Sequence, residues 1–189
     1  MRQLFSIIFI IFLASILVSA QSKTNAQISA QMKALNAAKN IQIEYDKSSN
    51  YSKLFMLSDE FANEQSKKNG LSSLTFGMMY GFNGTELTFT PDVFVLTFWA
   101  RGKNTKFAEM HQWTATVAGE TVDLGEARYA HKNGDEREFL NFAVTRENLS
   151  KIAQGKDVNF SLGNYQFKFT AEQLKQFADF LKISNMAEN

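Results

Sequence analysis

Hydrophobic and polar residues alternate with a period of two along most of the chain between residues 41 and 169. This spacing is typical of β-strands that have one buried face. It predicts strands in the segments IQIEYDK, YSKLFMLS, LSSLTFGMMYGF, VFVLTFWAR, HQWTATVAG, ETVDLGEARYAHK, DEREFLNFAVT, DVNFSLG and YQFKFT, and a short return strand in TELTFT. Turn-forming pairs separate several of them, such as Asn83-Gly84, Asn133-Gly134 and Gly163-Asn164. We therefore expect antiparallel hairpins and a meander, not βαβ units.

The segment at residues 93–101 differs from the others because both of its faces are apolar. One face carries Val93, Val95, Thr97 and Trp99, and the other carries Phe94, Leu96, Phe98 and Ala100. A strand of this kind is normally buried on both sides of its sheet. We therefore expect a second sheet over one face, and a helix or long loop over the other.

Helical spacing is found mainly near the two ends of the chain. Ile28, Met32 and Leu35 recur at the interval of a short amphipathic helix. A second helix is predicted to begin at Thr145 and to end at Gly155. Glu147, in its first turn, and the apolar residues Leu149, Ile152 and Ala153 support this second helix. A third helix is predicted after a capping box that runs from Thr170 to Gln173, because Leu174, Phe177, Ala178 and Leu181 follow at helical spacing. The polar segment 61–70 is expected to be a loop or a helical turn.

Together these patterns predict the fold class. We expect a mainly β (α+β) protein, built as an antiparallel β-sandwich or partly open barrel, with a short internal helix and a C-terminal packing helix. The 18 Phe, 2 Trp and 5 Tyr residues supply a large apolar core.

The first twenty residues have the layout of a secretory signal peptide. Arg2 precedes an apolar run from Leu4 to Val18, and Val18-Ser19-Ala20 predicts cleavage after Ala20. An uncleaved membrane anchor is the alternative, although the run is shorter than the roughly 20 residues of a spanning helix. The predicted division is residues 1–20 as signal peptide, 21–40 as helical lead-in, 41–183 as a single β-rich domain and 184–189 as polar tail. The mature chain is then secreted or periplasmic, without an integral membrane span.

The composition and the absence of known motifs argue against several kinds of binding and catalytic site. The chain has 20 Lys+Arg and 19 Asp+Glu residues, so it lacks the basic excess of a nucleic-acid-binding domain. It has no cysteine, which excludes thiol catalysis, cysteine-based zinc sites and disulfides. No GxSxG elbow, P-loop or GxGxxG pattern is present. We therefore assign no catalytic, cofactor-binding or metal-binding residue, expect no cofactor, and favour a protein that is not an enzyme.

The two histidines are candidate metal ligands because each has an acidic neighbour. Glu109 lies near His111, and Glu136 lies near His131. The histidines are far apart in sequence, so surface histidines are the preferred interpretation. A two-residue turn at Asn133-Gly134 would pair His131 with Glu136, and would explain the charges by pairing across a hairpin. The same count pairs Lys132 with Asp135, Ala130 with Arg137 and Tyr129 with Glu138.

Six aromatic residues allow two interpretations. Such residues on strands usually belong to the core, but they also line apolar ligand pockets or carbohydrate platforms. The six are Phe98, Trp99, Phe107, Trp113, Tyr129 and Phe142. We favour the core.

Two long segments carry a resemblance to a known group of proteins. They read TATVAGETVDLGEARY and EFLNFAVTRENLSKIAQGKDVNFSLGNYQFKFTAEQLKQFADFL. In this order of strands, short helix, hairpin and final helix, the chain resembles uncharacterised bacterial secreted or periplasmic β-rich domains, over roughly residues 41–181. The resemblance implies a single β-rich domain, and it brings no activity and no site residue.

The sequence therefore favours a secreted or periplasmic, non-enzymatic β-sandwich module that binds a protein or an envelope component. One alternative is a carrier that holds a small apolar ligand between its sheets. A hydrolase without a recognisable motif is a third hypothesis. Nucleic acid is not expected as a partner.

Overall fold

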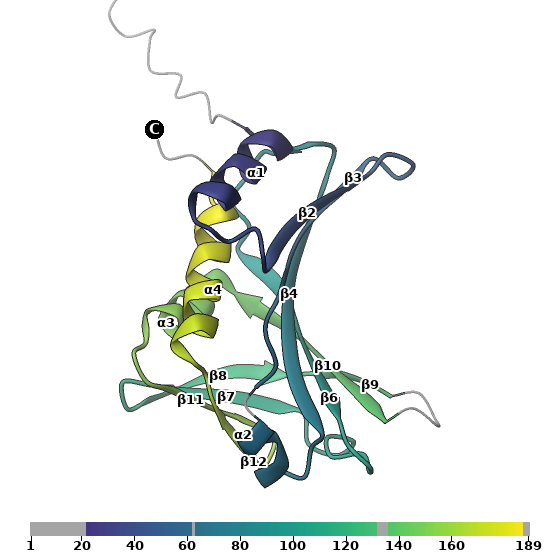
Figure 1. Cartoon of the computed structure of the whole chain (residues 1–189), viewed down its shortest axis with the longest axis vertical. Coiled ribbons are helices and arrows are strands. Elements are labelled where there is room, and N and C mark those ends of the chain that lie inside the picture. Colours follow the sequence, from purple (N-terminus) through teal and green to yellow (C-terminus); the bar gives the residue numbers. More distant parts are fainter. Residues whose placement is uncertain (1–21, 62, 132–135, 187–189) are drawn as a thin grey trace, which may run out of the picture.

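The computed structural model describes residues 22–61, 63–131 and 136–186, and shows a mainly β protein (Figure 1). In chain order, its elements are β1 (Lys23–Thr24), α1 (Asn25–Ala34), β2 (Ile41–Asp46), β3 (Tyr51–Leu57), α2 (Asn63–Lys68), β4 (Ser73–Asn83), β5 (Glu86–Leu87), β6 (Val93–Arg101), β7 (Gln112–Val117), β8 (Glu120–Glu126), β9 (Arg128–His131), β10 (Arg137–Thr145), α3 (Arg146–Gln154), β11 (Val158–Leu162), β12 (Tyr165–Lys168) and α4 (Ala171–Ile183). The described strands form three antiparallel sheets and close no barrel. The predicted fold class is confirmed. The predicted signal peptide, residues 1–20, lies outside the described residues.

A six-stranded sheet in the order β2-β3-β4-β6-β10-β9 is the largest unit. Its strands show the predicted alternation, and on β4 the side chains of Leu74, Phe76 and Met78 are buried. The same inner face continues through Phe98 of β6 and Phe142 of β10. In Figure 1, α1, α3 and α4 lie on one side of β4.

A four-stranded sheet in the order β12-β11-β7-β8 packs against the inner face of the larger one. The predicted meander through ETVDLGEARYAHK is wrong as a single strand, because this segment divides at Ala127. Residues before Ala127 pair with β7, and residues after it pair with β10. Buried Ala127 thus marks the point at which the chain passes from one sheet to the other.

The predicted return strand TELTFT is also shorter than expected. Only Glu86–Leu87 is extended, and it pairs with Lys23–Thr24 in a sheet of two short strands. This pairing ties the lead-in segment to the domain, and the fully buried side chain of Ile28 on α1 packs into the same core. Lys23 is held by the carbonyl oxygens of Ile183 and Asn185, at 2.8 and 2.9 Å from its Nζ.

The helix ends follow the capping chemistry read from the sequence. Thr145 caps α3 by accepting the Asn148 N–H, and Thr170 caps α4 in a complete capping box with Gln173. Along α4, Leu174 and Phe177 are buried as predicted. Ala178 is exposed instead, because the helix turns bulkier Phe180 and Ile183 toward the core.

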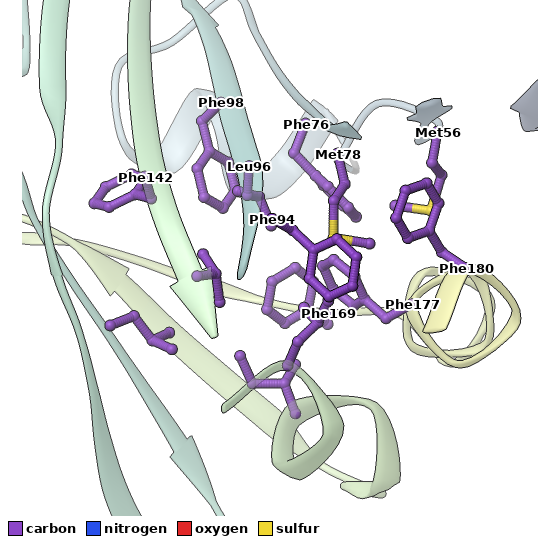
Figure 2. Close-up of a cluster of buried hydrophobic side chains, with 14 of the residues drawn as sticks. Met56, Phe76, Met78, Phe94, Leu96, Phe98, Phe142, Phe169, Phe177 and Phe180 are labelled. Carbon is purple, nitrogen blue, oxygen red and sulfur yellow. The ribbon is translucent and has the colours of Figure 1, made fainter. Parts of the chain in front are cut away.

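Aromatic rings fill the space between the sheets and beneath α4 (Figure 2). Phe160 and Phe169 stack with centroids 4.3 Å apart, and Phe76 stacks on Phe177 at 4.9 Å. Phe98 lies edge-on to Trp113 at 5.3 Å. Ring pairs at these separations are in direct contact.

The hairpin at residues 129–142 forms with a register different from the predicted one. His131 pairs with Glu138, not Glu136, and Tyr129 pairs with Leu140, not Glu138. Ala130 likewise pairs with Phe139 in place of Arg137. The predicted register is therefore wrong, and the predicted turn at Asn133-Gly134 and its inner pair, Lys132 and Asp135, lie outside the described residues. Because the register moves by two positions, every side chain keeps its predicted face of the sheet.

Candidate functional site

The outer face of the six-stranded sheet exposes an apolar surface, contrary to the prediction that β6 is covered on both sides. On β6, Val93 and Val95 are 49% and 40% exposed. Leu57 of β3 and Met79 of β4 are 53% and 40% exposed. The expectation failed because it was drawn from one strand alone, whereas covering the second face needs an element that the described chain does not place there. We call this surface the open face, and define it by its outward side chains: Phe55, Leu57, Met79, Val93, Val95 and Trp99.

The strand register makes the open face continuous. Phe55 on β3 pairs with Met79 on β4, and Met79 pairs in turn with Val95 on β6. Side chains directly opposite one another on antiparallel strands lie about 4.5–5.5 Å apart at Cβ. One apolar row therefore crosses three neighbouring strands, and exposed Ala143 extends it to β10.

Two aromatic rings on this face pack directly against the backbone of β4 at positions where the strand has glycine. A Cβ at Gly77 would lie 2.4 Å from Cη2 of Trp99, and one at Gly81 would overlap the Tyr51 ring. The two rings therefore cover the bare backbone of β4, as in the aromatic rescue of strand glycines. The groups that approach these two glycines most closely are aromatic side chains.

Polar groups surround the open face. Arg101 forms an ion pair with Glu136 at 3.2 Å near one end of β6. Within the face, Thr97 lies between Val95 and Trp99 on β6 and donates its hydroxyl to the side-chain oxygen of Asn141 on β10 at 2.7 Å. Exposed Lys53 lies on the β3 side. An apolar centre with aromatic residues and a polar rim is the usual anatomy of a protein interface.

The aromatic residues singled out in the sequence are divided between the core and this surface. The structure buries Phe98, Phe107, Trp113 and Phe142 and leaves Tyr129 partly buried, whereas Trp99 lies half-exposed on the open face. The core interpretation therefore holds for most of them, and Trp99 is the exception.

The two histidines lie at the β7–β9 end of the molecule. His111 stacks on Tyr129 with ring centroids 5.0 Å apart, and its Nδ1 is 3.9 Å from a Glu126 carboxylate oxygen. Its Nε2 is 3.0 Å from the carbonyl oxygen of Ala108. His131 instead pairs with Glu138 across the β9–β10 ladder. Among the described residues, no group of three or more His, Asp or Glu side chains is placed to hold a metal ion.

Glu138 is a buried carboxylate that the sequence did not single out as a central residue. It accepts the backbone N–H groups of Lys106 and Phe107 at 2.8–2.9 Å, and the Tyr129 hydroxyl at 3.1 Å. Burial raises the pKa of Tyr129 to about 12, and the charge of Glu138 adds to the rise. These bonds anchor the β6–β7 loop, and they use the carboxylate oxygens for structure.

Comparisons with known proteins add no name to this surface. No family model, no curated protein and no solved structure matches the chain. The resemblance to bacterial secreted β-rich domains therefore stays a prediction. None of the described helices is long and apolar enough to cross a membrane.

Proposed function

We propose that this protein is a non-enzymatic binding module that docks a protein partner on the open face. The observation that carries the proposal is the exposure of Val93 and Val95 on a central strand. Large exposed apolar patches mark interaction sites in folded proteins, because leaving such surface in water forgoes about 25 cal/mol for each Å².

The shape and chemistry of the surface suit a protein. The open face is a sheet surface, so another sheet or an amphipathic helix is a complementary shape for it. Trp99 and Phe55 stand among aliphatic side chains, and tryptophan is the residue type most often found to dominate binding energy. The polar rim supplies the surroundings that exclude water from such a centre.

The predicted secretion of the chain limits where the partner is found. With cleavage after Ala20, the module acts in the periplasm or outside the cell, and the partner is an envelope or extracellular protein. The alternative of an apolar-ligand carrier needs room between the sheets. The rings of Phe76, Phe160 and Phe169, which contact one another, occupy that region, so we favour binding at the surface.

The decisive experiment compares two charge-introducing variants. Val95→Glu places a carboxylate at the centre of the open face, and Ala178→Glu places one at an exposed position of α4, away from both the sheet's outer face and the strands of the four-stranded sheet. The immobilised mature chain is incubated with envelope extract, and retained proteins are identified by mass spectrometry. Burying an unpaired charge costs several kcal/mol, so Val95→Glu should weaken partner binding by about a hundredfold or more.

The proposal requires a protein that Ala178→Glu retains and that Val95→Glu loses. Proteins captured equally by both variants would contradict it. The open face could instead bind a second copy of the same chain, and sedimentation velocity tests this by measuring whether the protein is a monomer or a dimer. A wild-type dimer that Val95→Glu dissociates would show that the open face is a self-association surface, and the proposal of a separate partner would then be wrong.

A further inference from the structure

A second surface lies far from the open face, on the outer side of the four-stranded sheet. It is a groove of about 630 Å³ between α2 and the strands β12, β11 and β7. Thr116, Asn159 and Lys168 stand in one row across the three strands, and Ser161 and Gln166 stand in the next. The groove falls within the usual volume range of ligand sites, roughly 300–1,000 Å³.

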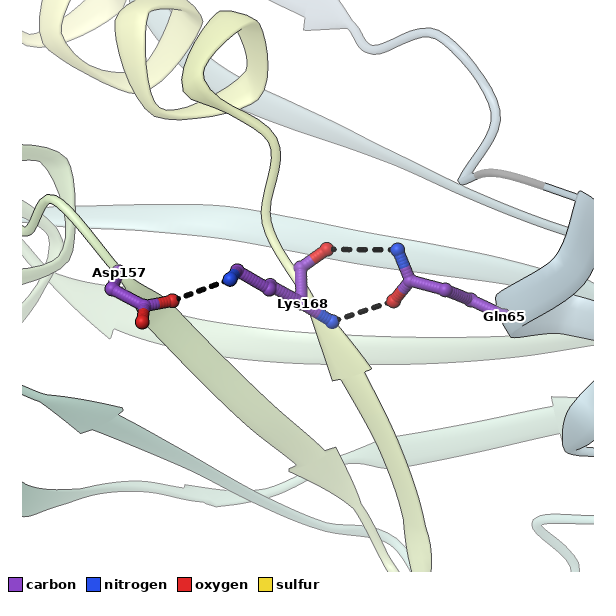
Figure 3. A network of polar contacts seen from close by, with 3 residues as sticks. All are labelled: Gln65, Asp157 and Lys168. Carbon is purple, nitrogen blue, oxygen red and sulfur yellow. Dashed lines mark hydrogen bonds and ion pairs between the residues drawn. The ribbon is translucent and has the colours of Figure 1, made fainter.

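The wall of the groove closes the free edge of β12. The Gln65 side chain accepts the Lys168 N–H at 2.7 Å and donates to the Lys168 carbonyl oxygen at 3.3 Å (Figure 3). Asn69 donates to the carbonyl oxygen of Gln166 at 2.9 Å. Three of the backbone groups that an added peptide strand would need are therefore already bonded, so this edge offers little for an extended peptide to join.

The side chains of the floor, in contrast, are available. Within the part of the chain that the structure describes, no hydrogen bond or ion pair engages the side chains of Thr116, Asn159, Ser161 and Gln166. Hydroxyls and primary amides both donate and accept hydrogen bonds. A ligand that matches them carries many groups that do the same, as the hydroxyls of a glycan do.

The charge of the groove selects among glycans. Its lining carries two ammonium groups and, among the described residues, no carboxylate. Lys168 is paired with Asp157, just outside the lining, at 2.8 Å (Figure 3). Lys68, in contrast, has no ion pair within the described chain. The aromatic residues of the lining, Phe160 and Phe167, are buried, so ring stacking on a neutral sugar is weak here.

We propose that this groove binds an acidic polysaccharide chain, with Lys68 pairing a ligand carboxylate, and with Asn159, Gln166, Thr116 and Ser161 bonding ligand hydroxyls. The site is separate from the open face and does not depend on the function proposed for it. The same lack of stacking that disfavours neutral sugars disfavours single-stranded nucleic acid, which relies on base–aromatic contacts.

The test is affinity electrophoresis of the mature chain through gels that contain one of three probes. Polygalacturonate offers carboxylates and hydroxyls, dextran offers hydroxyls alone, and poly-L-glutamate offers carboxylates on a peptide. We expect polygalacturonate to retard the protein at concentrations at least tenfold lower than those of the other two. Equal retardation by poly-L-glutamate would show a response to charge alone, and would overturn the proposal, as would absence of retardation by polygalacturonate.

Matched variants place the binding in the groove. Lys68→Gln should weaken polygalacturonate binding by about tenfold or more, as expected for one charged hydrogen bond. Lys33→Gln, which removes an exposed charge from α1, should leave binding unchanged. Asn159→Ala should also weaken binding without any change in net charge, and far-UV circular dichroism confirms that each variant is folded. Equal binding by the Lys68, Asn159 and Lys33 variants would refute this site.

Discussion

The contact between the Trp99 indole and the backbone of Gly77 predicts how much stability the protein loses when a methyl group is added at residue 77. In Gly77→Ala, the new methyl would lie 2.4 Å from Cη2 of Trp99 and 2.9 Å from the backbone oxygen of Met56. The β3–β4 pairing fixes the Met56 backbone, so the indole must leave its seat. Overpacking of this kind costs about 1–3 kcal/mol, and the lower backbone entropy of alanine returns about 0.5–1 kcal/mol. We expect a net destabilisation of about 1–2 kcal/mol, or roughly 3–6 °C in Tm.

Two measurements check this expectation. Urea unfolding gives the change in stability, and Gly102→Ala is the matched control, because the nearest atoms to its new Cβ are at an ordinary 3.5 Å. Acrylamide quenching reports the indole, since Trp113 is fully buried and Trp99 is the tryptophan that can become more exposed. A Gly77→Ala variant with unchanged stability and unchanged quenching would refute the reasoning. Trp99→Ala in the same background should remove the part of the cost that comes from the indole, which a double-mutant cycle measures, while the contact with the Met56 oxygen remains.

Three further predictions concern the stability of the fold. Glu138→Gln should lower the free energy of unfolding by about 2–3 kcal/mol in urea titrations, because an amide nitrogen replaces one of the two charged oxygens that accept backbone N–H groups. The pKa of Tyr129, about 12, exceeds the ordinary value near 10, so its contribution to stability is complete below pH 10 and is lost as the pH rises toward 12. Tyr129→Phe should therefore show a smaller fall in Tm between pH 9 and 11.5 than the exposed-site control Tyr45→Phe. Phe98→Ala should cost about 3–5 kcal/mol, and Val95→Ala on the open face should cost less than about 1 kcal/mol, by chemical denaturation.

Much of the fold could be predicted because its signals are local. The caps at Thr145 and Thr170 depend on residues within one turn of the chain, and the hairpin at Gly163-Asn164 depends on a single turn. The failures involve partners that are distant in sequence. The register of β9 on β10 is set by packing against β6 and the β6–β7 loop, and no local rule contains that information.

The surfaces were less predictable than the fold. The alternation on β6 correctly separates its two apolar faces, but it carries no information on whether anything covers the second face. The groove was missed altogether, since Gln65 lies in a segment that reads only as polar, and Asn159 reads only as the solvated side of a strand. Their juxtaposition depends on how α2 docks beside β12. A predicted strand with two apolar faces and too few elements to cover both is the signal that would have identified the open face.

The order in which the two sheets are assembled bears on how the chain is synthesised. β7 and β8 precede β10 in the sequence, whereas β11 and β12 follow it, so a ribosome releases the strands of the six-stranded sheet before the four-stranded sheet can be completed. Until then, the rings of Phe76 and Phe98 lack Phe169 and Phe160 as neighbours. A nascent chain that ends near Thr145 would therefore expose a large aromatic surface that is prone to aggregation. Keeping such chains from aggregating until the last hairpin and α4 are made is a task for chaperones.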